Sequence, residues 1–474
     1  MTTQTEAAPA PPRLRHQSLV LIIGEVTGRI MAFLAVISVT RAVSPEAWGI
    51  VALASGASMY LAKVADFGVE TVGIDEVAKQ RQRVGHLASV LLSVRMQIAV
   101  GMVAIGALWA SVALEGLERL AFLLYFLTLV PVAASTRWVH LGLEHATPVA
   151  IWRVVSDTLS LLGVVLFVRA SGDVWRFPLI LAGAELLNVT MLAGLLVRQG
   201  HRLEWQAGWT EARPVLRRAM PVTVQTLLGL AIYNANLIIL RLMWTRDDVG
   251  YYATAFAVLS FVSNVIVAHS TGALPSMSRS AHRVEEAQKV IDNVTLRSLA
   301  IAFPMAVGGT LLAADLMVGV YGPQYARSGA LLTILLWSMP FAAFRVAWFY
   351  VFIAFNRQDM LLRTMTYGAI CSTILNGVLI ARYGGRGAAW ATVLTDVFMA
   401  GLMLYDGTRF GLRLPNWRRI AKPGAGCVAM AAVVVAGAAW PWTARLVAGA
   451  AVYATALLAI GAVRIDRHGL SVPL

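Results

Sequence analysis

Charged residues are scarce in this sequence. Only 14% of the 474 residues are Asp, Glu, Lys or Arg, whereas 58% are hydrophobic, and the mean hydropathy is +0.70. So little polar surface cannot cover a soluble globule of this length. The composition therefore indicates a polytopic membrane protein. The net charge of +14 lies in short clusters between apolar runs, which fits membrane topology better than nucleic-acid binding.

Sequence features of metal sites and of ATP-driven pumps are also missing. The two cysteines, Cys371 and Cys427, lie inside apolar runs, so neither a disulfide framework nor a metal site is expected. No GxxxxGK[ST] phosphate loop occurs. ATP-driven transport by this chain alone is therefore not expected.

Long hydrophobic runs fill most of the chain. Because about 20 residues cross the hydrocarbon of a bilayer, the sequence divides into about fourteen candidate spans. No loop between them exceeds about 25 residues, which leaves no room for a soluble catalytic or nucleotide-binding domain. We predict an all-α, polytopic membrane protein that is not an enzyme and uses no cofactor. The predicted spans are 18–41, 47–68, 86–110, 119–138, 148–168, 177–197, 217–242, 249–272, 296–320, 328–355, 361–381, 387–405, 423–440 and 443–463.

A weak internal repeat divides these spans. The stretches TRAVSPEAWGIVALA and RLMWTRDDVGYYATA both place an Arg, a short polar turn and a Gly before an apolar run, with Gly49 and Gly250 in the same place. The spacing predicts two pseudo-symmetric six-helix bundles with a central cleft between them. The predicted segments are a disordered cytoplasmic tail (1–17), the first bundle (18–198), a cytoplasmic linker (199–216), the second bundle (217–405), a helix pair (406–463) and a cytoplasmic tail (464–474).

Basic residues in the loops predict the orientation. With the N-terminus in the cytoplasm, most Lys and Arg fall on the cytoplasmic side, as the positive-inside rule requires. Both termini are then cytoplasmic. The basic residues on this side include Lys79, Arg81, Arg83, Arg198, Arg202, Arg213, Arg217, Arg218, Arg279, Arg283, Lys289, Arg297, Arg409, Arg413, Arg418, Arg419 and Lys422.

Four sets of motifs carry a resemblance to a known family. They are SPEAWGIVALA leading to DFGVETVGIDEVAK, DDVGYYATAFAVLSFVSNVI leading to ALPSMSR, DLMVGVYGPQYARSGALLTIL, and ILNGVLIARYGGRGAAWATVLTD. In order and spacing they resemble the polysaccharide flippases of the multidrug/oligosaccharidyl-lipid/polysaccharide exporter superfamily, which also holds the multidrug antiporters and the lipid II flippases.

The resemblance implies a function and a location. It implies a flippase of the bacterial inner membrane that moves an oligosaccharide linked to undecaprenyl diphosphate from the cytoplasmic to the periplasmic leaflet by alternating access. The pathway that it serves would make a cell-surface polysaccharide, namely O-antigen, capsule or exopolysaccharide. Candidate partners are the membrane lipids and the polysaccharide polymerase and glycosyltransferases of the same pathway.

Other functions stay open. Lipid II flippases carry a Ser-Arg pair and a Gly-rich turn near the end of the first span, and SVTRAVSPE keeps only part of this pattern. Cation-coupled multidrug exporters share the superfamily fold, but their cationic cargo suits an acidic cleft better than mixed charges. A membrane-embedded glycosyltransferase or polymerase would need a large periplasmic loop, which the predicted loops do not provide.

Charged residues inside spans are candidate cargo contacts. A charge at the bilayer centre costs about 2.5 to 3.5 kcal/mol, so it normally faces a partner or a water-filled cavity. Glu25 and Arg29 stand at i,i+4 in the first span, and Lys63 and Asp66 at i,i+3 in the second. A diphosphate needs positive charge along its route. The competing interpretation of Lys63 and Asp66 is structural, because a lysine near a span end can reach the interface.

Further polar residues complete the predicted site. On a helix Asn234 and Asn236 point about 200° apart, so at most one faces the cleft. His269 could couple transport to protons or could be a structural histidine, and Arg153 and Asp157 suit a structural pair at i,i+4. The remaining predicted cargo contacts are Asn264 and Arg345, and the remaining candidates for ion coupling are Glu185 and Asp396, although any of the charged ones could pair between helices.

Overall fold

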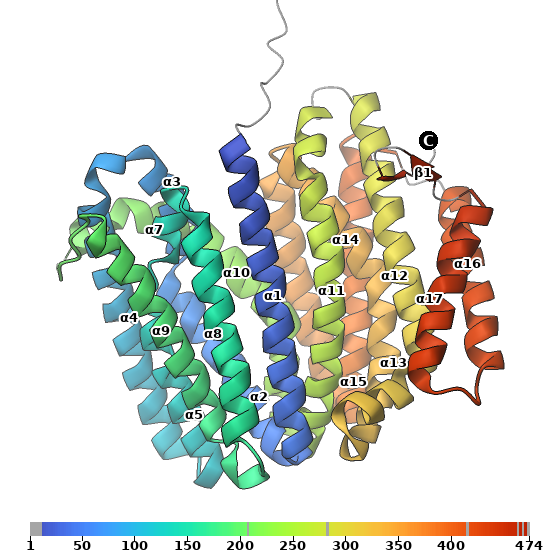
Figure 1. Ribbon diagram of the computed structural model, residues 1–474, viewed down its shortest axis with the longest axis horizontal. Coiled ribbons are helices and arrows are strands. Elements are labelled where there is room, and N and C mark those ends of the chain that lie inside the picture. Colours follow the sequence, from blue (N-terminus) through green and yellow to red (C-terminus); the bar gives the residue numbers. More distant parts are fainter. Residues whose placement is uncertain are drawn as a thin grey trace, which may run out of the picture. The chain divides into compact units, whose positions relative to one another are not determined.

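The computed structural model describes residues 12–205, 208–280, 284–413, 417–461, 464–466 and 469–471. These residues are almost entirely helical (Figure 1). In chain order the elements are α1 (Pro12–Ala42), α2 (Pro45–Asp66), α3 (Val69–Lys79), η1 (Arg81–Arg83), α4 (Val84–Ala113), α5 (Gly116–Leu127), α6 (Leu129–Ala133), α7 (Arg137–Gly142), α8 (Ala146–Phe167), η2 (Ser171–Asp173), α9 (Arg176–Arg198), α10 (Trp209–Met243), α11 (Arg246–Ser280), α12 (Val284–Tyr321), η3 (Pro323–Tyr325), α13 (Ala326–Leu335), η4 (Leu336–Ser338), α14 (Met339–Ala354), α15 (Gln358–Arg409), α16 (Trp417–Ala436), α17 (Trp442–Ala459), β1 (Arg464–Asp466) and β2 (Gly469–Ser471).

The helices confirm the predicted fold class. Twelve helical segments of the described chain are long and apolar enough to cross a membrane, and Ile420–Ala436 is a shorter apolar helix. One of the twelve, Gln358–Arg409, consists of two helices joined at Gly384, whose φ of 55° and ψ of −131° are not helical. Counting these two helices separately and adding the shorter one gives the fourteen predicted spans.

A side-chain hydrogen bond and a close ring contact accompany the kink at Gly384. A helix break frees backbone carbonyls that must find another donor. The indole nitrogen of Trp244 donates to the carbonyl of Ile380, 2.8 Å away. A Cβ on Gly384 would lie 2.9 Å from the Trp244 ring. Glycine therefore permits both the backbone conformation and the close ring contact.

The described residues form two compact units. The first comprises Met1–Val43 and Ala54–Leu227, and residues 1–11 of the predicted tail lie outside the described part. Within it α1 runs alongside α8 (Figure 1). Gly24 permits this close packing, because a Cβ there would lie 2.6 Å from the Cβ of Ala150, as is typical of small residues between membrane helices. Trp138 is fully buried in the apolar core of this unit.

The second unit comprises Ser44–Leu53 and Leu228–Leu474. The two repeated motifs meet inside it. A Cβ on Gly49 would collide with the carbonyl of Arg246, and one on Gly250 would collide with the carbonyl of Pro45. Glu46 and Arg246 add an ion pair at 3.4 Å. The equivalent glycines of the repeat therefore let the first turns of α2 and α11 pack backbone against backbone.

The C-terminal part of this unit holds a helix pair. Helices α16 and α17 pack on each other and on α12 (Figure 1). Cys427 is buried there among apolar side chains. After α17, β1 and β2 form an antiparallel hairpin in which Arg464 pairs with Ser471. The sequence analysis did not predict this hairpin, which lies in the segment 464–474 assigned to a tail.

Candidate functional site

Two of the breaks in the membrane-crossing helices of the first unit lie near Arg95. Helix α2 ends at Asp66, and α3 begins at Val69 after Phe67 and Gly68, whose φ angles are 48° and 69°. The predicted fourth span is divided in the same way, because α6 ends at Ala133 and α7 begins at Arg137. Helices α3 and α7 are in contact. Broken helices inside membrane proteins need polar partners for their freed backbone groups, and they often line binding sites.

Arg95 of α4 connects the two breaks. Its side chain is 3% exposed and lies 3.1 Å from the carboxylate of Asp66. Its guanidinium also donates to the carbonyls of Val132 and Ser135, each at 3.2 Å. Asp66 in turn accepts the backbone N–H of Glu70 at 3.2 Å. Arg95 and Asp66 therefore satisfy backbone groups at both breaks and fix where α3 and α7 begin.

Arg137 lies beside these breaks and is held by two carboxylates. Its guanidinium donates to Glu25 of α1 at 2.5 Å and to Glu70 of α3 at 2.7 Å. The side chains of Arg137, Glu25 and Glu70 are 33%, 33% and 35% exposed. An Arg fork between two half-exposed carboxylates is rigidly positioned but still accessible, and its planar shape suits a phosphate.

Lys63 supplies a further cation on α2. Its side chain is half-buried, and its charge acts on Glu70. Among the described residues, no side chain forms an ion pair or hydrogen bond with the Lys63 ammonium group. We call Glu25, Lys63, Asp66, Glu70, Arg95 and Arg137 the polar cluster. Its three acids and three bases balance, so the site is mixed in charge.

Glu25 and Asp66 form ion pairs with residues other than the neighbours that the sequence spacing indicated. Glu25 pairs with Arg137, and Asp66 with Arg95. Arg29 is exposed on α1. The predicted pair of Arg153 and Asp157 forms at 2.7 Å. Glu185 of α9 accepts a long hydrogen bond, 3.4 Å, from Asn188.

The charged residues predicted in the second unit pair with each other. Arg345 of α14 lies 3.1 Å from Asp396 of α15, and their side chains are 11% and 3% exposed. The Tyr233 hydroxyl donates to Asp396 at 3.1 Å, and the Arg345 guanidinium sits 5.4 Å from the centre of the Tyr233 ring. Both charges are thus enclosed and mutually compensated.

The remaining predicted residues of this unit are dispersed. Asn236 is buried and donates to the Tyr252 hydroxyl, whereas Asn234 is half-buried. Asn264 donates to the carbonyl of Ser260, one turn back on its own helix, at 2.9 Å. The Nε2 atom of His269 is buried, and none of the described residues forms a hydrogen bond with it.

Comparison with known proteins identifies the family. Residues 14–281 match the model of a family described as polysaccharide biosynthesis protein. The chain belongs to this family. It is therefore a multi-pass membrane protein of the polysaccharide biosynthesis family, and the resemblance stated from the sequence is confirmed.

Two curated relatives match parts of this chain. A probable low-salt glycan biosynthesis flippase of Haloferax volcanii, Agl15, is 24% identical over 45% of this chain and 47% of its own length. The succinoglycan biosynthesis transport protein ExoT of Rhizobium meliloti is 20% identical over 64% of this chain and 62% of its own length. The chain thus spans about half of one relative and less than two thirds of the other.

Solved structures show the same fold over most of the chain. The lipid II flippase MurJ in an inward closed conformation aligns with a TM-score of 0.78 over 93% of this chain and 98% of its own, at 12% identity. An inward-facing multidrug transporter of the MATE family aligns with a TM-score of 0.67 over 81% of this chain and 94% of its own, at 15% identity. At such low identity these matches establish the fold alone.

Proposed function

We propose that this protein is a flippase for lipid-linked oligosaccharides. Its cargo is an oligosaccharide on undecaprenyl diphosphate, moved from the cytoplasmic to the periplasmic leaflet of the bacterial inner membrane by alternating access, with both termini cytoplasmic. Family membership and the names of the two relatives support a polysaccharide precursor as cargo. The observation that carries the proposal is the half-exposed Arg137, held beside two helix breaks inside the membrane-crossing part of the first unit.

The roles of the cluster follow from its geometry. A diphosphate entering a membrane needs fixed cations, because its charge is expensive to desolvate without partners. The Lys63 ammonium group forms no ion pair or hydrogen bond with the described residues, so it binds phosphate without breaking one. Arg137 exchanges a carboxylate for a phosphate oxygen, and Glu25 and Glu70 take the guanidinium back when the cargo leaves. This exchange keeps the site from trapping its anionic cargo.

Arg95 and Asp66 have a positioning role in this mechanism. They are buried and occupied with each other and with backbone groups, so they hold α3 and α7 in place while Arg137 and Lys63 contact the cargo. Arg29, one turn along α1 from Glu25, stays a predicted third cation.

The experiment is polysaccharide export in a bacterial strain that lacks its own flippase, normalised to inserted protein. We expect Arg137→Lys to retain part of the export and Arg137→Gln to lose most of it, because a point charge replaces the fork only in part. Arg81→Gln is the matched control, because it breaks an exposed ion pair of the same unit, with Glu144. Wild-type export by Arg137→Gln would contradict the proposal. Rescue of a strain depleted of its lipid II flippase, without rescue of polysaccharide export, would assign lipid II as the cargo instead.

A further inference from the structure

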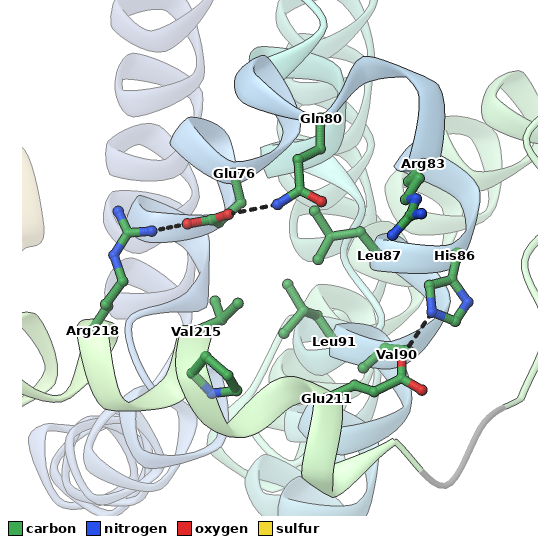
Figure 2. Close-up of a pocket in the computed structure, with 11 residues that line it drawn as sticks. Glu76, Gln80, Arg83, His86, Leu87, Val90, Leu91, Glu211, Val215 and Arg218 are labelled. Atoms are coloured by element: carbon green, nitrogen blue, oxygen red, sulfur yellow. Dashed lines mark hydrogen bonds and ion pairs between the residues drawn. The ribbon is translucent and has the colours of Figure 1, made fainter.

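The first unit contains a cavity away from the polar cluster. It has a volume of about 330 Å³ and lies between α3, η1, the start of α4 and the start of α10. Figure 2 shows its arrangement: Arg83 and His86 on one side, Glu76 and Arg218 on the opposite side, and apolar side chains between them. The apolar lining consists of Leu87, Val90, Leu91, Pro214 and Val215.

Both acids of this cavity already contact another side chain of the lining. Glu76 pairs with Arg218 and accepts a hydrogen bond from Gln80 at 3.1 Å. Glu211 lies 2.7 Å from His86. Arg83 is exposed, and in the described part of the chain its guanidinium forms no ion pair or side-chain hydrogen bond. Arg83 is therefore the basic residue of the lining that has no ion-pair partner among the described residues. It lies beside the apolar side chains of the cavity.

The surroundings of the cavity are those of a membrane interface. It lies where two membrane-crossing segments begin, Arg81–Ala113 and Trp209–Met243. Trp205 and Trp209, next to the start of α10, are 67% and 46% exposed, and exposed tryptophans of this kind mark the headgroup level. This end of the first unit also carries the exposed Arg198, Arg202, Arg213 and Arg217. The predicted orientation places it at the cytoplasmic leaflet, whose lipids are anionic.

We propose that this cavity binds the phosphate group of an anionic phospholipid. Arg83 contacts the phosphate, and Leu87, Pro214 and Val215 contact the glycerol and the first acyl carbons. A basic pocket between membrane helices on the cytoplasmic side is suited to such a headgroup, and the apolar floor favours a lipid over a soluble phosphate. The volume is at the lower end of ligand sites, which fits a headgroup.

Bound lipid would join two segments of the first unit. Two walls of the cavity carry the proposed contacts: η1 and the start of α4, with Arg83 and Leu87, and α10, with Val215. Across the cavity in Figure 2, His86 of α4 is in contact with Glu211 of α10, and Glu76 of α3 pairs with Arg218 of α10. A phospholipid that contacts both walls therefore stabilises the folded unit, because a ligand that binds only the native state raises its stability.

The test measures lipid binding by the purified, full-length protein in detergent, so it does not depend on export. We expect phosphatidylglycerol to raise the melting temperature of wild type, and phosphatidylcholine to do so much less. Arg83→Gln should weaken phosphatidylglycerol binding about tenfold, the loss of roughly one charge-assisted contact, and Arg83→Lys should keep part of it. Arg198→Gln, which removes an exposed arginine that does not line the cavity, is the matched control and should bind as wild type does.

Three results would overturn this site. Equal phosphatidylglycerol affinity in wild type and Arg83→Gln would remove Arg83 from it. Equal stabilisation by phosphatidylcholine would show that the cavity does not select an anionic lipid. Binding of undecaprenyl diphosphate that depends on Arg83, with no effect of phosphatidylglycerol, would assign the cavity to the cargo. Loss of export in Arg137→Gln with normal lipid binding would support the proposed function independently of the cavity.

Discussion

Arg137 of the first unit and Arg345 of the second pair with carboxylates in environments that differ in exposure. In the first, Arg137 and its two carboxylates are each about one third exposed, and Lys63 has no ion-pair partner in the described chain. In the second, Arg345 and Asp396 are 11% and 3% exposed and share a tyrosine. An enclosed pair has already satisfied its charges, whereas an open cluster can exchange partners. This difference supports our proposal that anionic cargo binds in the first unit and that the second pair maintains structure.

The largest loss of stability is expected at Arg95, the buried arginine of the polar cluster. Arg95→Ala would leave Asp66 buried without its charged partner and would remove the guanidinium donor from the carbonyls of Val132 and Ser135. Removing one member of a buried ion pair costs about 3 to 5 kcal/mol, so little folded protein should be recovered. The measurement is the amount of protein in the membrane and its melting temperature in detergent. Arg81→Ala is the control, since an exposed pair contributes about 0 to 1 kcal/mol. Equal stability of the two variants would refute the anchoring role.

The enclosed pair gives the second prediction. Arg345→Gln alone should destabilise the protein, because Asp396 then stays buried without its charged partner. The double variant Arg345→Gln with Asp396→Asn should regain most of the lost stability, since replacing both members of a buried pair is often nearly neutral. Thermal unfolding of the three proteins in detergent decides this. A double variant as unstable as the single one would mean that the pair contributes more than mutual compensation.

A smaller effect, on export alone, is expected at Lys63. Because no ion pair is broken, Lys63→Gln should leave the melting temperature unchanged. It should lower export about tenfold or more through the loss of one phosphate contact, about 1.5 to 3 kcal/mol for a charged hydrogen bond. Lys63→Arg should retain most of the export. Unchanged export in Lys63→Gln would show that this lysine has only the structural role considered from the sequence.

The smallest effect is expected at His269. If this histidine carries a proton during transport, His269→Gln should weaken export mainly when the imposed proton gradient is low, with the protein level unchanged. The Nε2 atom has no hydrogen-bond partner among the described residues, so the substitution breaks no contact there. Export that falls equally at every gradient, or not at all, would exclude the coupling role.

How far the sequence predicts this structure depends on the distance over which each signal acts. The spans were predictable because hydrophobic runs are local, and the double glycine in YGGRG marks the kink at Gly384. The ion-pair partners of Glu25 and Asp66 were not predictable, because tertiary packing determines them. Arg137 lies 112 residues from Glu25. It follows a break in AAST, a stretch without glycine or proline, so no local pattern distinguishes it from the other arginines near span ends.

The most direct test compares the removal of Arg137 and its two carboxylate partners with the removal of the enclosed pair. One variant replaces Glu25, Glu70 and Arg137 by glutamine, and the other is Arg345→Gln with Asp396→Asn. Both remove complete groups of partners, so neither leaves a new unpaired charge among them. The measurement is polysaccharide export per inserted protein in a strain without its own flippase. We predict near wild-type export for the variant of the enclosed pair and loss of most export for the variant of the open cluster. Full export by the open-cluster variant would contradict the assignment of anionic cargo to the first unit.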